Sequence, residues 1–142
     1  MRAVITPLLC IAATAALLTG CSLQDDSAGP GPTGVATKIP QDTNRAKSSK
    51  QAQDFRSWVD KHGNGSQQEA AARVQRIIGD LDEKSGAAFI STDINGGPTQ
   101  VKNPASTAET IVKTFTAYIK PQQTRVSVYD VFGHVLTGNS GT

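Results

Sequence analysis

The sequence predicts an α+β fold in which three helices pack on a small three-stranded mixed sheet, in the order α-α-β-α-β-β. Two observations support this prediction. All seven aromatic residues lie between Phe55 and Phe132, which places the hydrophobic core in that span. Within it, apolar residues recur at helical spacing in three segments, and three other segments have the composition, the alternation or the flanking turn residues of strands. We therefore expect one globular domain over residues 50–138, followed by a short disordered tail at 139–142.

Two helices are predicted first. From Lys50 to His62 the apolar residues fall on one face, and the glycines of the following HGNGS end this helix. The segment Ser66-Gln67-Gln68-Glu69 has the pattern of a capping box, in which the serine and glutamate side chains bind free amides of the first turn. It opens the second helix, whose apolar stripe consists of Ala70, Val74, Ile77, Ile78 and Leu81.

The first strand and the third helix follow. The run Ala87–Ile94 is apolar and rich in strand-forming residues, and the turn residues Asn-Gly-Gly-Pro end it. A second capping box, Ser106 to Glu109, opens the third helix, which ends before Pro121. The apolar stripe of this helix keeps helical spacing throughout: Ala108, Ile111, Val112, Phe115 and Ile119.

The last two strands are predicted to form a hairpin. Thr124–Tyr129 alternates apolar and polar residues, the turn runs from Asp130 to Gly133, and His134–Thr137 returns as the partner strand. A strand-helix-strand step implies a right-handed crossover with the first two strands parallel. The hairpin then adds an antiparallel strand.

The first twenty residues have the features of a secretory signal peptide. Arg2 supplies positive charge, and the stretch Ala3–Leu18 is apolar. A membrane-spanning helix needs about twenty apolar residues in a row, so Pro7 and the polar residues after Gly20 disfavour that alternative. Two other interpretations of this segment stay open. One is cleavage at an ordinary signal site near Ala13-Thr14-Ala15, and the other is a buried cysteine in a segment that is not cleaved.

The segment Leu18-Thr19-Gly20-Cys21 resembles the lipobox of bacterial lipoprotein precursors. In that family the cysteine thiol receives a diacylglyceryl group, and a dedicated signal peptidase cuts before the cysteine, here between Gly20 and Cys21. The resemblance implies a mature chain whose one cysteine is acylated, so that no intramolecular disulfide can form. Two acyl chains hold a protein durably on a bilayer. We therefore expect a lipid-anchored protein on the extracytoplasmic face of the cell membrane.

Residues 21–49 are expected to carry the acylated cysteine and a disordered tether. Their composition is Gly, Pro, Ser, Thr, Asp, Gln and Lys, with isolated apolar residues only. Such a segment buries too little apolar surface to offset its ordering entropy. A flexible chain of this length spans roughly 30 Å. The tether would let the domain sample a shell above the membrane.

The C-terminal domain also resembles a group of small secreted lipoproteins that are frequent in actinobacteria. These end in a segment similar to VSVYDVFGHVLTGN after a helix similar to AETIVKTFTAYI. The resemblance implies a shared fold and no assigned activity. This chain departs from the pattern in one respect: such turns are usually polar, whereas Val131 and Phe132 occupy the turn here.

Neither catalysis nor metal binding is predicted, and we expect no cofactor. His62 and His134 are the two histidines, and no nucleophile motif such as GxSxG accompanies them. Asp93 and Asn95 in DINGG lack the later ligands of a calcium loop. One acidic cluster is typical of a solvated helix face: Asp80, Asp82 and Glu83.

The charge balance argues against nucleic-acid binding. Thirteen Lys and Arg remain against twelve Asp and Glu once Arg2 is removed, and no basic run contains aromatic residues. Two bulky apolar residues at a turn, Val131 and Phe132, instead predict a contact with a partner protein or with the bilayer surface. The alternative is that Phe132 packs on the third helix.

The expected function is that of a lipid-anchored extracytoplasmic protein, a non-enzymatic interaction or accessory module at the cell envelope. Two alternatives stay open. One is a small enzyme acting on cell-wall material, with a cleft lined by Asp93, Asp130 and His134. The other is a ligand-binding lipoprotein. The sequence does not indicate an oligomeric state or the identity of an envelope partner.

Overall fold

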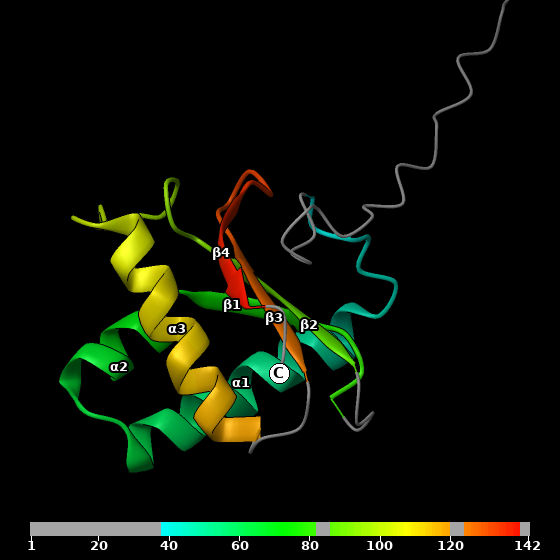
Figure 1. The fold of residues 1–142 in the computed structure, drawn as a ribbon, viewed down its shortest axis with the longest axis horizontal. Coiled ribbons are helices and arrows are strands. Elements are labelled where there is room, and N and C mark those ends of the chain that lie inside the picture. Colours follow the sequence, from blue (N-terminus) through cyan, green and yellow to red (C-terminus); the bar gives the residue numbers. More distant parts are fainter. Residues whose placement is uncertain (1–37, 82–85, 120–123, 140–142) are drawn as a thin grey trace, which may run out of the picture.

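The computed structural model describes residues 38–81, 86–119 and 124–139 (Figure 1). Within these residues it has three helices and a four-stranded sheet, which confirms the α+β class and corrects the predicted number of strands. The elements in chain order are α1 (Arg45–His62), α2 (Gly65–Ala71), β1 (Val74–Ile78), β2 (Ala87–Thr92), α3 (Pro104–Ile119), β3 (Arg125–Tyr129) and β4 (Val135–Asn139).

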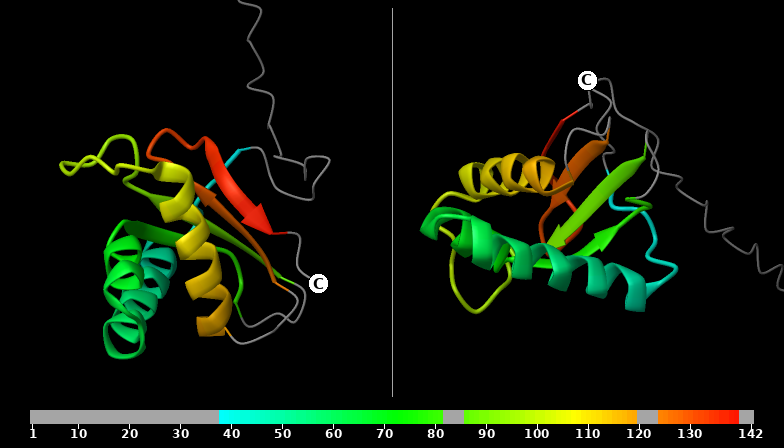
Figure 2. Two further views of the ribbon diagram at one scale, coloured as in Figure 1. Left: turned by 60° about the vertical axis from the view of Figure 1, so that its left-hand side comes forward. Right: turned by 90° about the horizontal axis from the view of Figure 1, so that it is seen from below.

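The sheet is mixed, and its strands follow one another in sequence order from β1 to β4. β1 is antiparallel to β2, β2 is parallel to β3, and β3 is antiparallel to β4. Since β2 and β3 are parallel neighbours, α3 is the crossover helix that the sequence predicts between them. The three helices gather on one face of the sheet (Figure 2), with α1 against β1, and α3 against β3 and β4.

The predicted second helix is wrong in its C-terminal half. α2 ends at Ala71, and the segment from Val74 to Ile78 forms strand β1. The register of β1 against β2 shifts between Val74 and Arg76, so Val74 and Ile77 both face the core although they are three residues apart. A bulge inserts one extra residue into a strand and breaks its two-residue period. Here the bulged strand therefore imitates the i, i+3 spacing of a helix.

Gly79 ends β1 where another backbone passes very close. Its φ is +127°, and a Cβ at this position would lie 2.1 Å from the carbonyl oxygen of Ala87 on β2. Glycine therefore allows both the backbone conformation and the close approach. Asp80 follows and forms an ion pair with Lys47 on α1, at 3.6 Å. The other members of the predicted acidic cluster, Asp82 and Glu83, lie outside the described residues.

Both helices are capped by other residues than the predicted capping boxes, α2 by a reciprocal box and α3 by a single side chain. The box of α2 is formed by Asn64 and Gln67, each side chain accepting the backbone N–H of the other at 2.9–3.0 Å. α3 begins at Pro104, and Asn103 Oδ1 accepts the amide of Ser106 at 3.1 Å. Asparagine caps helices as well as serine does, and proline suits the first helical position. In each case an asparagine two or three residues before the expected serine begins the helix.

A cluster of aromatic rings joins α1 and α3 in the core. Phe55 on α1 and Phe115 on α3 are both fully buried, and their ring centroids lie 5.3 Å apart in an edge-to-face arrangement. Tyr118 packs 5.5 Å from Phe55. Such edge-to-face pairs add to the stabilisation from burial alone. The predicted stripe of α3 is buried at Ala108, Ile111 and Phe115, and partly buried at Val112 and Ile119.

The N-terminal boundary of the predicted domain is wrong, because residues 38–49 belong to the fold. We call residues 38–44 the N-terminal strap. At one end of the strap, Lys38 forms an antiparallel bridge with His134, next to β4. At the other end, Asp42 accepts a hydrogen bond from Ser48 Oγ at 2.6 Å and forms an ion pair with Arg76 of β1 at 3.0 Å. The predicted C-terminal boundary at 138 also moves by one residue, because β4 runs to Asn139.

The strap predicts a dependence of stability on pH. The Ser48 hydroxyl lowers the pKa of Asp42, burial raises it, and the Asn44 amide and Arg76 lower it further, so the pKa is below the ordinary 3.8. The carboxylate therefore stabilises the fold above about pH 4, and this contribution is lost as the pH falls through the folded-state pKa. In urea unfolding at a series of pH values, the free energy of unfolding of the wild type should fall at acid pH. We expect Asp42→Asn to make this fall, the acid limb of the curve, less steep.

Asp54→Asn is the matched control for this measurement. Asp54 lies half-exposed on α1 in an ion pair with Lys50, and removing an exposed pair of this kind has little effect on stability. Retention of the wild-type acid limb in Asp42→Asn would show that the strap is not held by the ionised carboxylate.

Candidate functional site: the β3–β4 hairpin tip

The hairpin tip, residues 130–135, is a tight turn closed by backbone hydrogen bonds. The amide of Asp130 donates to the carbonyl of His134 at 2.9 Å, and the amide of Gly133 donates to the carbonyl of Asp130 at 3.0 Å. Gly133 has a φ of +82°, a conformation that favours glycine. The amide of Val131 donates to the carbonyl of Ile94, which ties the tip to the loop after β2. The turn is therefore fixed from both sides.

The carboxylate of Asp130 organises the tip. It is 4% exposed, and its Oδ1 accepts the amides of Phe132 and His134, both at 2.9 Å. Its Oδ2 accepts Nδ2 of Asn95 at 3.0 Å. Asn95 has a φ of +71°, which asparagine tolerates better than most residues. Because β2 and β3 are parallel, the residues that follow them meet at the same edge of the sheet.

These contacts keep Asp130 ionised. Burial by itself raises the pKa of Asp130, but the hydrogen bonds from Asn95 and from the amides of His134 and Phe132, together with the nearby His134 ring, lower it below the ordinary 3.8. A carboxylate that accepts several N–H groups favours its charged form. The group therefore acts as a fixed acceptor that holds the turn.

The apolar side chains of the tip point outward. Val131 is 47% exposed, Phe132 69% and Val135 36%, and these are the exposed large apolar residues of the described part of the chain. The alternative that Phe132 packs on α3 is therefore wrong, and the predicted contact of Val131 and Phe132 with a partner or with the bilayer stays a prediction. One side of Val131 rests on the loop after β2, since a Cβ added to Gly96 would lie 2.4 Å from Val131 Cγ1.

Of the three residues considered for an enzyme, Asp93, Asp130 and His134, two lie close together. His134 Nδ1 lies 3.5 Å from Asp130 Oδ2, but the His134 side chain is 78% exposed. Asp93 forms a different pair, with Arg73 at 3.5 Å, and its Oδ1 is buried without a hydrogen-bond partner. The structure thus brings Asp130 and His134 together and engages Asp93 elsewhere.

The other histidine ends α1, as its position in the sequence predicts. His62 Nδ1 lies 2.8 Å from the carbonyl oxygen of Trp58, and the two rings stack with centroids 4.9 Å apart. The contact satisfies a carbonyl of the last helical turn. Across residues 38–81, 86–119 and 124–139, three or more His, Cys, Asp or Glu side chains nowhere gather in a group that could hold a metal ion.

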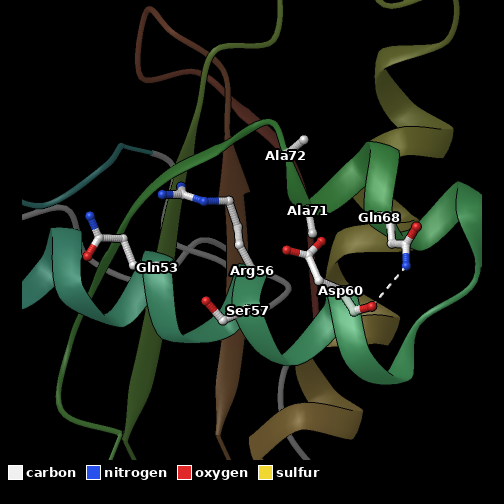
Figure 3. Close-up of a pocket in the computed structure, with 7 residues that line it drawn as sticks. All are labelled: Gln53, Arg56, Ser57, Asp60, Gln68, Ala71 and Ala72. Atoms are coloured by element: carbon white, nitrogen blue, oxygen red, sulfur yellow. Dashed lines mark hydrogen bonds between the residues drawn. The ribbon is translucent and has the colours of Figure 1, made fainter.

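A shallow groove of about 300 Å³ between α1 and α2 was not predicted from the sequence (Figure 3). Its polar side chains serve the fold. Arg56 donates to the carbonyl oxygen of Val74 on β1, and Gln68 Nε2 donates to the carbonyl oxygen of Asp60 at 3.2 Å. Gln51, five residues before Arg56 on α1, likewise donates to the carbonyl oxygen of Ile77 at 2.7 Å. These helix side chains line the edge strand β1.

A larger open groove of about 700 Å³ lies between α2, residues 99–103 and the first turns of α3. Arg73 and Lys102 contribute its basic groups, and Glu69 an acidic one. This groove was also not predicted, because its lining comes from two segments, residues 66–73 and 99–110, that are more than twenty positions apart in the sequence.

Comparisons of the chain with protein-family models, with curated proteins and with solved structures give no match. In the described part of the chain, none of the helices combines the length and the apolar character needed to cross a membrane. Residues 1–37, which contain the predicted signal peptide, Gly20 and Cys21, lie outside the described residues.

Proposed function

We propose that this chain is a lipid-anchored extracytoplasmic protein that acts as a non-enzymatic interaction module at the cell envelope. The anchor is supported by the sequence: a positively charged start, an apolar segment and the lipobox-like Leu18-Thr19-Gly20-Cys21. In this proposal the diacylglyceryl group on Cys21 holds the mature chain on the membrane, and the α+β domain is displayed beyond it.

The observation that supports an interaction module is the hairpin tip. Two neighbouring apolar side chains, Val131 and Phe132, are exposed on a turn that the carboxylate of Asp130 holds from within. Grouped apolar residues on the surface of a small domain mark a contact site. A turn that is already ordered loses little conformational freedom on binding. The tip is therefore suited to bind another surface, and the carboxylate of Asp130 is already used in holding the turn.

The anchor gives a direct test in cells that produce the full-length chain. We expect Cys21→Ser to move the protein from the membrane fraction to the soluble fraction, because it removes the acceptor of both acyl chains. Intact-mass measurement of the wild type should show a mature chain that begins at Cys21 and carries the diacylglyceryl group. Fractionation and mass are read from the same preparation.

Cys10→Ser is the matched control, since this cysteine lies within the apolar segment that the proposed cleavage removes. It should leave the membrane fraction and the mature mass unchanged. An unacylated wild-type chain, or membrane retention of Cys21→Ser equal to that of the wild type, would refute the proposed anchor.

A further inference from the structure

We propose that the hairpin tip contacts the same bilayer surface in which the acyl chains of Cys21 are held. This inference rests on the proposed function, and it names the occupant of the tip: the lipid interface itself. It follows from where the anchored segment joins the fold, from the apolar residues at that place and from the small size of the exposed patch.

The N-terminal strap begins beside the tip. Lys38, the first described residue, forms an antiparallel bridge with His134 of the tip. The next residue, Ile39, packs on the turn, since a Cβ added to Gly133 would lie 3.1 Å from Ile39 Cγ2. Figure 2 shows the start of the strap, in cyan, next to β4. The segment that leads back to Cys21 therefore leaves the domain at the hairpin tip.

The length of that segment limits the distance between the tip and the membrane. Sixteen residues lie between Cys21 and Lys38, so Lys38 is seventeen positions along the chain from the proposed anchor. A flexible chain of that length has a root-mean-square span of about 20–25 Å, and even fully extended it reaches only about 60 Å. The tip lies beside the point where the anchored segment enters the domain. The anchor therefore holds the tip nearer to the lipid interface than the parts of the domain that are farther from Lys38.

A bilayer also fits the size and composition of the patch. Val131, Phe132 and Val135 form a small protrusion, whereas a stable protein interface usually buries about 800 Å² on each partner. Aromatic and aliphatic side chains on a rigid turn can enter the headgroup region singly, without a complementary pocket.

Anchoring makes a weak contact sufficient. Once one site of a molecule is held, a second site joined to it by a short flexible segment acts at an effective concentration of the order of millimolar. The tip therefore needs little affinity of its own to lie on the surface most of the time. The contact would orient the domain, with the hairpin tip toward the lipid and the C-terminal end of α1, at the opposite side in Figure 1, away from it.

Site-specific photocrosslinking tests this inference on the full-length protein. A photoreactive phenylalanine analogue replaces Phe132 in one variant and Lys61, exposed near the end of α1, in the other. One portion of each variant is irradiated in the producing cells. From a second portion, kept in the dark, the acylated protein is purified and irradiated in vesicles made of equal parts phosphatidylethanolamine and phosphatidylglycerol. The mass of each adduct is determined, together with the mass of the acyl group on Cys21.

The expected result is a phospholipid adduct at position 132, in cells and in vesicles, and no phospholipid adduct at position 61. An acylated chain whose position 132 reacts with another protein or a second copy, or which gives equal lipid adducts at both positions, overturns the inference and leaves the anchor intact. An unacylated chain overturns the anchor, and the inference with it. Phe132 is exposed, so its replacement is not expected to disturb folding.

Discussion

Replacing Phe55 by alanine is expected to lower the free energy of unfolding by about 3–5 kcal/mol. The side chain is fully buried and contacts the rings of Phe115 and Tyr118, with centroids 5.3 and 5.5 Å away. Truncation removes apolar burial, leaves a cavity between α1 and α3 and breaks the edge-to-face pair. Small domains have total stabilities of about 5–15 kcal/mol. This one change therefore removes a large part of the stability of the fold.

Phe132→Ala is the matched control, because it deletes the same atoms from a side chain that is 69% exposed. Its effect should be within about 0.5 kcal/mol of zero. Urea denaturation followed by far-ultraviolet circular dichroism measures both variants on one scale. If the two substitutions cost the same, the assignment of Phe55 to the core and of Phe132 to the surface is wrong.

Asp130→Ala is expected to cost about 2–4 kcal/mol, because it removes the acceptor of three N–H groups at once. The amides of Phe132 and His134 and the side chain of Asn95 lose their common partner. Where water reaches the turn, it can accept hydrogen bonds from these N–H groups and so reduce the cost. The loss should be local as well as global, with faster hydrogen exchange at the amides of Phe132 and His134.

Asp130→Asn separates the hydrogen bonds from the charge. An asparagine oxygen can still accept the two turn amides, while the interaction with Asn95 requires one of the two amide groups to reorient. We expect this variant to cost about 1 kcal/mol and to keep the slow exchange of both amides. Equal destabilisation by alanine and asparagine would contradict the role of Oδ1 as acceptor, and normal exchange in the alanine variant would contradict the whole arrangement.

The elements that the sequence predicts best are those whose period is regular and whose ends carry strong signals. α3 is the clearest example, because its apolar positions keep helical spacing and Pro121 follows. The hairpin was also predictable, from the alternation of β3 and from the turn residues Asp130 and Gly133. In α3 local preference and burial agree, so one pattern suffices to identify the helix. In β3 the alternation identifies the strand but not its burial, because Ser127 and Tyr129 are buried as well as Val126 and Val128.

The missing strand shows where such patterns fail. The bulge in β1 places Val74 and Ile77 on the same face, and a period of three looks helical when the sequence is taken alone. The β-branched residues of this segment favour a strand. This strand preference was the signal that could have identified β1, but the helical spacing of the apolar residues was given more weight in the prediction. The pairing with β2 decides the outcome, and it depends on residues more than ten positions away.

The exposure of the tip was predictable, but its construction was not. Val131 and Phe132 are adjacent apolar residues between turn residues, so their position in the sequence is informative. Asn95, in contrast, lies thirty-five positions before Asp130 and reaches it only because β2 and β3 run parallel. The strap was missed for a similar reason. Its polar composition is typical of a linker, and its order depends on Asp42 meeting Arg76 and Ser48.

The side chains of α1 that reach β1 have a consequence for a protein crowded on a surface. An edge strand with unpaired backbone groups is a template on which a second copy can add a strand and begin aggregation. Gln51 and Arg56 occupy the carbonyls of Ile77 and Val74 on this edge. Molecules confined to two dimensions meet more often than molecules in solution. Under the proposed anchor, protection of β1 would let many copies stand side by side on a membrane without joining their sheets along this edge.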